Sequence, residues 1–310
     1  MWETKLEFIR PGLHSLIQDR GRAGLQSSGV PQGGAMDLRS MIISNRLVGN
    51  RDNNPTIEMT LMGPKIKTIG DAYIAITGAN IEVKINDKPT PMYETLHVPS
   101  GSIINLGKIT KGVRSYMAIN GEWKIDQWLE SCSPLPVIIL KNLQSNQIKK
   151  NSSLVVNTQK LINKKTLAEN LKPNFDRQNN IRVIIGPEYN LMSRSNQSYF
   201  FKTKFTVHKN SNRMAVSMVE HIPNFKKQKE LISSANLIGT IQLNNQGQLI
   251  ILMNDAGTTG GYPRIANVIS SDLTKVGQLK AGEKINFEVV DIDFAINEIK
   301  KEKDSLLSIL

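Results

Sequence analysis

The chain has 310 residues, of which 39% are hydrophobic and 21% are charged, and its formal net charge is +12. This apolar content excludes a disordered chain, and the length is comfortable for two domains of about 150 residues each. No stretch approaches the roughly 20 apolar residues that a membrane span requires. The N-terminus, Met1–Lys5, lacks the basic-then-apolar pattern of a signal peptide. We therefore expect a cytoplasmic protein without a membrane contact.

The lone cysteine and the positive charge exclude further classes. Cys132 has no second cysteine to pair with, which excludes an internal disulfide framework and a multi-cysteine zinc site, and we expect no bound metal. The lysine runs, such as Lys149-Lys150 and Lys164-Lys165, have no interleaved aromatic residues and match no nucleic-acid motif. The sequence predicts a solvated basic surface, part of which faces an acidic partner protein, and no nucleic acid.

In chain order, the first predicted element is a helix over Ala35–Val48, in which Met36, Ile43 and Leu47 share one side. Short β-branched segments follow and are separated by turn residues such as Gly78-Ala79-Asn80. The predicted strands are Ile66–Ile69, Ala72–Ile76, Ile81–Ile85, Ser102–Leu106, Ser115–Ile119 and Pro136–Leu140.

The stretch Asn142–Asn180 is rich in Asn, Lys and Gln, and we place a domain junction there, near residue 175. The last segment, Asp291–Leu310, has apolar residues at helical spacing. Between them lies a second set of predicted strands: Ile181–Ile185, Lys204–Val207, Ile238–Leu243, Leu249–Met253 and Ile285–Val290.

Many short strands without alternating helices favour antiparallel sheets or barrels over a parallel α/β sheet. We therefore predict a mainly β protein with a few short helices. Its predicted domains are residues 1–175 and residues 176–310.

The segment Leu252–Pro263 is the most informative part of the chain for function. An apolar strand ends there in Asp255, followed by Thr258-Thr259, Gly260-Gly261 and Tyr262-Pro263. Such a loop presents an acceptor, several donors and backbone N–H groups together at a strand end, where scaffolds often position function. An Asx-type turn with a Gly-Gly hairpin explains Asp255 and the glycines, but it explains the Thr-Thr and Tyr-Pro pairs less well.

Three further blocks are candidates for binding. Glycines are dense from Pro11 to Asp37, which fits a loop around a ligand or a neighbouring chain, or a tight connector. Asn45–Asn50 reads as a helix exit, with Gly49 in the position that favours a left-handed residue. Arg213, in Ser211-Asn212-Arg213-Met214, offers a forked contact to a carboxylate or phosphate, although a surface turn explains the block equally well.

Several catalytic motifs are missing from the sequence. Gly277 and Gly282 have the glycine spacing of a phosphate-binding P-loop, but Glu283 stands where its lysine should follow. There is no Gly-x-Ser-x-Gly elbow and no His-Glu-x-x-His pair. Cys132 has no cue for a lowered pKa.

Taken together, the blocks resemble the family known as allophanate hydrolase subunit 2 or biotin-dependent carboxyltransferase, which includes one component, the C subunit, of bacterial ATP-dependent 5-oxoprolinase. The resemblance runs from about Pro11 to about Phe287. Its most specific elements are Gln18–Arg22, Gly34–Asp37, Asn45–Asn50, Gly112–Tyr116, Ser211–Met214, Gly239–Gln242 and Thr258–Pro263.

The resemblance implies two cyclophilin-like β-barrel domains that face each other across a cleft. It implies one component of an amide-bond hydrolase that converts 5-oxo-L-proline, ATP and water into L-glutamate, ADP and phosphate. That enzyme is active only when an inhibitor-like subunit (the B subunit) and a ring-opening subunit (the A subunit) are also present. We expect no cofactor on this chain: ATP enters through a partner, and biotin, where used, is on a separate chain because no Met-Lys-Met acceptor is present.

In this interpretation Asp255 contacts or deprotonates an amide N–H, and Thr258, Thr259 and the N–H groups of Gly260 and Gly261 hold the oxyanion. Arg213 pairs with a carboxylate or a phosphorylated intermediate. The predicted catalytic residues are Asp255, Thr258, Thr259 and Tyr262, and the predicted substrate-binding residues are Arg213, Gln242, Gly260, Gly261, Asn45, Gly34 and Asp37.

The chain departs from the family pattern at Gly33, Asn212, Ser234 and Gly257, where the family usually has Ser, Asp, Glu and Gln. These changes leave the substrate open between 5-oxoproline, urea and another amide. Two alternatives also stay open: a urea or amide carboxyltransferase component that uses biotin on another chain, and a non-catalytic partner that antagonises a kinase inhibitor.

Overall fold

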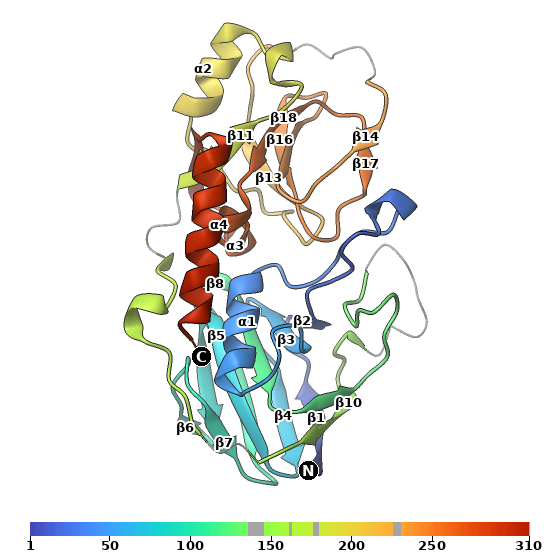
Figure 1. Cartoon of the computed structure of the whole chain (residues 1–310), viewed down its shortest axis with the longest axis vertical. Coiled ribbons are helices and arrows are strands. Elements are labelled where there is room, and N and C mark those ends of the chain that lie inside the picture. The colour runs from blue at the N-terminus through green and yellow to red at the C-terminus, as the bar shows by residue number, and fades with distance from the viewer. Residues whose placement is uncertain (136–145, 161–162, 176–179, 226–230, 310) are drawn as a thin grey trace. The chain divides into compact units, whose positions relative to one another are not determined.

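The computed structural model describes residues 1–135, 146–160, 163–175, 180–225 and 231–309 (Figure 1). The chain divides into two compact units. Unit 1 comprises Met1–Arg22, Gly33–Phe175 and Ser305–Leu310, and unit 2 comprises Ala23–Gln32 and Asp176–Asp304. The chain is therefore not divided at a single position. Ala23–Gln32, from the N-terminal half, belongs to unit 2, and Ser305–Leu310, from the C-terminal half, belongs to unit 1. The predicted strand Pro136–Leu140 lies outside the described residues.

Unit 1 is built on a ten-stranded sheet whose main path runs β2-β3-β8-β4-β1-β10-β9, with β5 paired to β6, β7 and β8. Its helix α1 spans Leu38–Leu47 and packs on β5 and β8 (Figure 1). The strands are β1 Trp2–Arg10, β2 His14–Gln18, β3 Thr56–Thr60, β4 Lys65–Ile69, β5 Ala72–Ile85, β6 Lys88–Pro89, β7 Leu96–Val98, β8 Ile103–Ile119, β9 Glu122–Lys124 and β10 Ser153–Thr158.

One predicted turn and one predicted break between strands in unit 1 are wrong. Gly78-Ala79-Asn80 does not separate two strands, because β5 continues through it with register shifts against β8. Gly78 has a φ of +87°, and a Cβ there would lie 2.6 Å from the carbonyl oxygen of Arg114, so the glycine forms a bulge and not a loop. In the same way, the segments predicted as separate strands on either side of Gly112 form the single strand β8.

Unit 2 contains a seven-stranded sheet of order β12-β19-β11-β18-β15-β16-β13, and an isolated bridge between Val207 and Met218 brings its two edges together. Only the β11–β19 pair among the described pairs of this sheet is parallel. The strands are β11 Asn180–Ile185, β12 Phe205–Thr206, β13 Ala215–His221, β15 Thr240–Leu243, β16 Gln248–Leu252, β18 Arg264–Val268 and β19 Lys284–Val289, and β14 Ser234–Ala235 pairs separately with β17 Thr259–Gly260.

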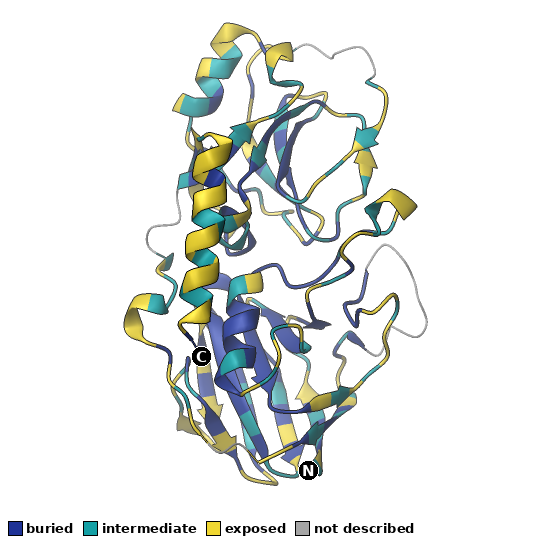
Figure 2. Ribbon diagram, viewed as in Figure 1, coloured by how far each residue is buried: buried dark blue, intermediate teal, exposed yellow. Residues whose placement is uncertain are grey.

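The helical elements of the described chain include two that the sequence did not predict, α2 (Arg194–Lys202) and α3 (Leu273–Gly277). The C-terminal helix is α4 (Ile292–Leu307), which is long and largely exposed (Figure 2). Single 3-10 turns lie at η1 Gln26–Ser28, η3 Glu169–Leu171, η5 Tyr189–Leu191 and η6 Ser270–Asp272.

The prediction of a mainly β chain with two barrel-like sheets and few helices is confirmed. None of the described helices is long and apolar enough to span a membrane.

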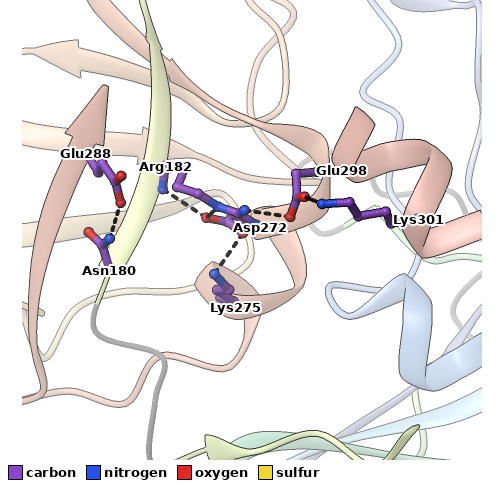
Figure 3. A network of polar contacts seen from close by, with 7 residues as sticks. All are labelled: Asn180, Arg182, Asp272, Lys275, Glu288, Glu298 and Lys301. Atoms are coloured by element: carbon purple, nitrogen blue, oxygen red, sulfur yellow. Dashed lines mark hydrogen bonds and ion pairs between the residues drawn. The ribbon is translucent and has the colours of Figure 1, made fainter. Parts of the chain in front are cut away.

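A buried ion-pair network holds η6, α3 and α4 to β11 in unit 2 (Figure 3). Arg182 donates to both carboxylate oxygens of Asp272, at 2.6 and 3.0 Å, and Lys275 lies 2.9 Å from the same carboxylate. Arg182 also donates to Glu298 at 2.6 Å, and Glu298 in turn pairs with Lys301. Asp272 is fully buried, so its charge depends on these partners in place of water.

Burial alone would raise the pKa of the Asp272 carboxyl, but hydrogen bonds from the side chain and backbone of Arg182, and then from Lys275, outweigh burial and lower that pKa. A folded-state pKa below the unfolded value stabilises the protein above the unfolded pKa, which is about 3.9 for Asp. This stabilisation is lost as the pH falls through the folded-state pKa.

We predict that Asp272→Asn lowers the free energy of unfolding by about 2 kcal/mol at pH 7, because it removes the charge that Arg182 and Lys275 share, while Glu298 remains a partner of Arg182. Urea denaturation followed by circular dichroism measures this difference. The gap between the wild type and Asp272→Asn should shrink as the pH is lowered below about 4. Lys301→Ala, which removes an exposed partner of Glu298, serves as the control and should change stability by less than about 0.5 kcal/mol. A gap that is the same at pH 7 and pH 3 would show that the Asp272 charge does not stabilise the fold.

Candidate active site

The segment between β16 and β18 contains all four predicted catalytic residues, and it lies within unit 2. Asp255 is buried, whereas Thr259 and Tyr262 are exposed and Thr258 is half-buried. Thr259 and Gly260 form β17, which pairs with Ser234–Ala235 of β14. This pairing fixes the second half of the loop as a strand edge.

Asp255 forms a buried, two-pronged ion pair with Arg213. Arg213 Nε lies 2.8 Å from Asp255 Oδ2, and Arg213 Nη2 lies 2.9 Å from Asp255 Oδ1. The backbone N–H of Asp255 also donates to the carbonyl of Arg213 at 3.1 Å. The sequence assigned Asp255 to a substrate amide N–H and Arg213 to a carboxylate or a phosphorylated intermediate. In the structure these two side chains bind each other. In this geometry the pair fixes the start of the loop, and neither charge is presented to a ligand.

A chain of amide side chains holds the middle of the loop. Gln242 is buried and its Nε2 donates to Asn236 Oδ1 at 3.0 Å. Asn236 Nδ2 then donates to the carbonyl of Gly257 at 3.3 Å, and the Asn236 backbone N–H donates to the carbonyl of Thr258 at 2.9 Å. Gln242 therefore positions the loop through Asn236.

The glycines of the loop differ in what surrounds them. A Cβ at Gly260 would lie 2.9 Å from Asn236 Nδ2 and 3.0 Å from Gln242 Nε2, so a side chain there would displace the ends of these two amides. A Cβ at Gly261 would lie 3.0 Å from the carbonyl oxygen of Leu231. At Gly257 only one atom lies within 4 Å, so this exposed position has room for the larger side chain that the family usually carries.

A cavity of about 330 Å³ lies beside this loop in unit 2. Among the predicted site residues, Thr258 borders it, whereas Asp255, Thr259, Gly260, Gly261 and Tyr262 do not. The bordering residues are neutral: Gln26, Pro31, Gln32, Asn236, Leu237, Ile238, Met253, Asn254, Ala256, Gly257, Thr258, Asn267, Ser270 and Leu273. The cavity is therefore lined by amide and hydroxyl groups beside apolar side chains, a surface suited to a planar polar molecule.

Three predicted substrate-binding residues lie in unit 1, and each has a local structural role. Asp37 caps α1, accepting from the backbone N–H of Ser40 at 2.9 Å and from its hydroxyl at 2.7 Å. Asn45 donates to the carbonyl of Asn54 at 2.8 Å and accepts from Asn50 at 3.0 Å. A Cβ at Gly34, whose φ is +85°, would lie 2.8 Å from the backbone of Arg20 and Gly21.

Within unit 1, a buried carboxylate to which the sequence gave no role holds the residues just before Ala23 in place. Asp19 accepts from the hydroxyls of Ser131 and Ser133 at 2.7 Å and from the backbone N–H of Gly21 at 2.8 Å. It also accepts from the Cys132 backbone N–H at 2.9 Å. Burial, and then the Asp19 carboxylate, raise the pKa of the Cys132 thiol well above its usual value, which disfavours the thiolate.

Sequence reasoning missed the amide residues that border the cavity, chiefly Asn236, Asn254 and Asn267. They come from three different loops and strands, and isolated asparagines in a sequence rich in Asn give no signal of their own. No group of three or more His, Cys, Asp or Glu residues in the described part of the chain is arranged to hold a metal ion.

Comparison with known proteins identifies relatives along nearly the whole chain. The family profile of the carboxyltransferase domain, subdomain A and B, matches residues 28–289. The C subunit of the Escherichia coli (strain K12) 5-oxoprolinase is 33% identical over 295 residues, which cover 94% of this chain and 93% of that protein. The Haemophilus influenzae protein of the same name is 32% identical over 287 residues, covering 93% and 92%.

The solved structure of the Kluyveromyces lactis urea carboxylase superposes with a TM-score of 0.89 at 26% identity. The match covers 99% of this chain but only 29% of the yeast chain, so this chain corresponds to one part of that larger enzyme. The fold and the sequence agree, and the chain belongs to the carboxyltransferase domain family, subdomain A and B.

Proposed function

We propose that the chain is the C subunit of an ATP-dependent 5-oxoprolinase, an amide-bond hydrolase in which it acts together with an inhibitor-like subunit and a ring-opening subunit. The observation that carries this proposal is the 33% identity to the C subunit of the Escherichia coli 5-oxoprolinase over nearly the full length of both chains. The complex converts 5-oxo-L-proline, ATP and water into L-glutamate, ADP and phosphate.

The neutral cavity of unit 2 supports a role in holding an amide substrate. A lactam such as 5-oxoproline is planar around its amide, with one N–H donor and one carbonyl acceptor. Asn236, Asn254, Thr258 and Asn267 provide both donors and acceptors beside apolar side chains, which is the mixture that orients such a molecule. In this proposal Thr258 donates to the carbonyl oxygen as negative charge develops on it.

The proposal assigns ATP to a partner chain. The sequence has no P-loop, and the cavity is bordered by no lysine or arginine that would pair with a triphosphate. The inhibitor-like and ring-opening subunits therefore complete the enzyme in this proposal, and the proposed place of the complete enzyme is the cytoplasm.

The likeness to the yeast urea carboxylase favours a second candidate function. In this alternative the cavity holds urea or another small amide, and the chain catalyses carboxyl transfer from a biotin that is attached to another protein. Urea and 5-oxoproline share the planar N–C=O group, so the neutral cavity is compatible with either substrate.

The proposed function predicts ATP-dependent release of glutamate from 5-oxoproline when the chain is co-expressed with the products of its neighbouring genes. In that complex Thr258→Ala should lower kcat/KM by about 100-fold, because it removes a donor to the developing oxyanion. Thr259→Ala, at an exposed position that does not border the cavity, is the matched control and should change kcat/KM by less than about twofold.

Three outcomes of this experiment are informative. Equal effects of the two threonine substitutions would contradict the role proposed for Thr258. Turnover of urea with carboxylated biotin, but not of 5-oxoproline, would favour the second candidate. A complex that assembles without turning over either substrate would contradict both functions and favour a regulatory partner.

The structure also predicts that Asp255 stabilises the loop through Arg213, which is a role distinct from proton abstraction. Asp255→Asn should lower the free energy of unfolding of unit 2 by about 3 kcal/mol, because the buried Arg213 loses its counter-charge. Urea denaturation followed by circular dichroism measures the change, since all three tryptophans lie in unit 1. A variant with wild-type stability and no activity would instead assign Asp255 to the chemistry.

A further inference from the structure

Gln18, the last residue of β2 in unit 1, is a buried polar side chain without a partner. It is fully buried, and neither its Oε1 nor its Nε2 makes a hydrogen bond to any described residue. Burying a carboxamide without hydrogen bonds is unfavourable, and native proteins rarely leave both ends of one unpaired. The position therefore requires an explanation beyond packing.

The strand register places Gln18 among polar groups. Ile17 and Ile57 point into the apolar core of unit 1, so Gln18 lies on the opposite face of the sheet. On that face Gln18 is paired with Thr56, and Glu58 follows two residues later on β3. Both of these neighbours are buried as well.

Glu58 continues this polar face to β8. Its Oε2 accepts from the Tyr116 hydroxyl at 2.7 Å and from the backbone N–H of Met36 at 2.9 Å, and its Oε1 lies 3.8 Å from Arg114 Nε. Burial, and then the charge of Glu58, raise the pKa of Tyr116 well above its usual value, so the phenol stays protonated and donates. We call Gln18, its strand partner Thr56, Glu58 and Tyr116 the Gln18 cluster.

The segment Gly34–Asp37 covers this cluster. Met36 donates to Glu58, and the backbone N–H of Asp37 donates to the Tyr116 hydroxyl at 2.8 Å. Gly33 and Gly34 precede this cover with φ values of +66° and +85°. Both conformations favour glycine, and glycine tolerates a change of backbone conformation more readily than residues with a side chain, so these two positions are where the cover would open.

Three of the sequence blocks that resemble the family thus meet at one place. Gln18–Arg22 supplies the carboxamide, Gly112–Tyr116 supplies the phenol of Tyr116, and Gly34–Asp37 supplies the cover. The functional site in unit 2 uses none of them.

We propose that Gln18 binds a cis-amide, a ligand whose N–H and C=O groups lie on the same side of the C–N bond. A carboxamide pairs with such a ligand through two parallel hydrogen bonds: Nε2 donates to the ligand carbonyl, and Oε1 accepts from the ligand N–H. Lactams, urea and primary amides present this edge, whereas the trans amide of a peptide does not. The pair satisfies both ends of Gln18 at once.

This inference deepens the proposed function, because 5-oxoproline is a lactam and urea has the same edge. It assigns a second amide-binding position, in unit 1, and it requires the Gly34–Asp37 cover to lift so that the ligand can enter. Binding to the chain alone tests it separately from turnover by the complex.

The test uses the full chain and thermal unfolding followed by tryptophan fluorescence, which reports on unit 1 because Trp2, Trp123 and Trp128 all lie there. The probes are 5-oxoproline, 2-pyrrolidinone and urea, with N-methyl-2-pyrrolidinone as the matched control that lacks the N–H. We expect a lactam or urea to raise the Tm and the N-methyl compound to leave it unchanged. The response to 2-pyrrolidinone and to urea separates a lactam site from a urea site.

Gln18→Leu distinguishes a binding residue from a structural one. Leucine keeps much of the shape and removes the unpaired polar atoms, so the variant without ligand should have a Tm at least as high as that of the wild type. Its affinity for the responding probe should fall at least tenfold. Gln159→Leu, at an exposed position in the same unit, should retain both the wild-type Tm and the wild-type affinity.

Two results would overturn the inference. A lower Tm for Gln18→Leu without ligand would show that the carboxamide stabilises the fold, and equal responses of the wild type and Gln18→Leu to the probes would show that it binds none of them. If the probes bind through Gln18 but the reconstituted complex releases no glutamate, the inference stands and the proposed function fails. If the complex releases glutamate but the probes do not bind through Gln18, the proposed function stands and the inference fails.

Discussion

The ion pair between Arg213 and Asp255 fixes the part of unit 2 on which the candidate site depends. A carboxylate and a guanidinium are stable away from water only when each satisfies the other, and here both oxygens of Asp255 are engaged at 2.8 and 2.9 Å. The pair holds the start of the loop, and the Gln242–Asn236 chain holds its middle. The Arg182–Asp272 network holds the turn that carries Ser270 and Leu273, two residues that border the same cavity. The residues that border the cavity are therefore held in place by two ion pairs, Arg213–Asp255 and Arg182–Asp272, whose own side chains do not border it.

This separation of charge from the cavity limits the chemistry that the residues bordering it can perform. Amides and hydroxyls orient a substrate and stabilise an oxyanion, but they do not exchange protons readily near neutral pH. None of the residues that border the cavity is an Asp, Glu, His, Cys or Lys. In the proposed enzyme this chain therefore contributes orientation, and the groups that move protons and consume ATP come from the partner subunits. This composition supports the proposal that the chain is active only in a complex.

The fold was predictable from the sequence to the extent that local pattern determines it. The predicted strand Ile81–Ile85 ends where β5 ends, because the end of a strand at a hairpin is set by local residues. Gly78 was misread as a turn because a bulge and a loop both favour glycine, and only the partner strand β8 distinguishes them. Helix α2 was missed because Phe200 is its only buried residue, and the stacking partner of Phe200, Phe287, lies far along the chain.

The sites were predictable only where function is concentrated in one segment. The loop after β16 could be proposed as a candidate site because its residues are adjacent, but the pairing of Arg213 with Asp255 could not be predicted, because 42 residues separate them and nothing local specifies their contact. Gln18 shows the same limit more sharply. Its sequence neighbours identify a motif, yet its burial and its missing partners depend on β3 and on the cover from Gly34–Asp37. A buried carboxamide with no partner is therefore a property of the folded chain, and it is the kind of local cost that a bound ligand would offset.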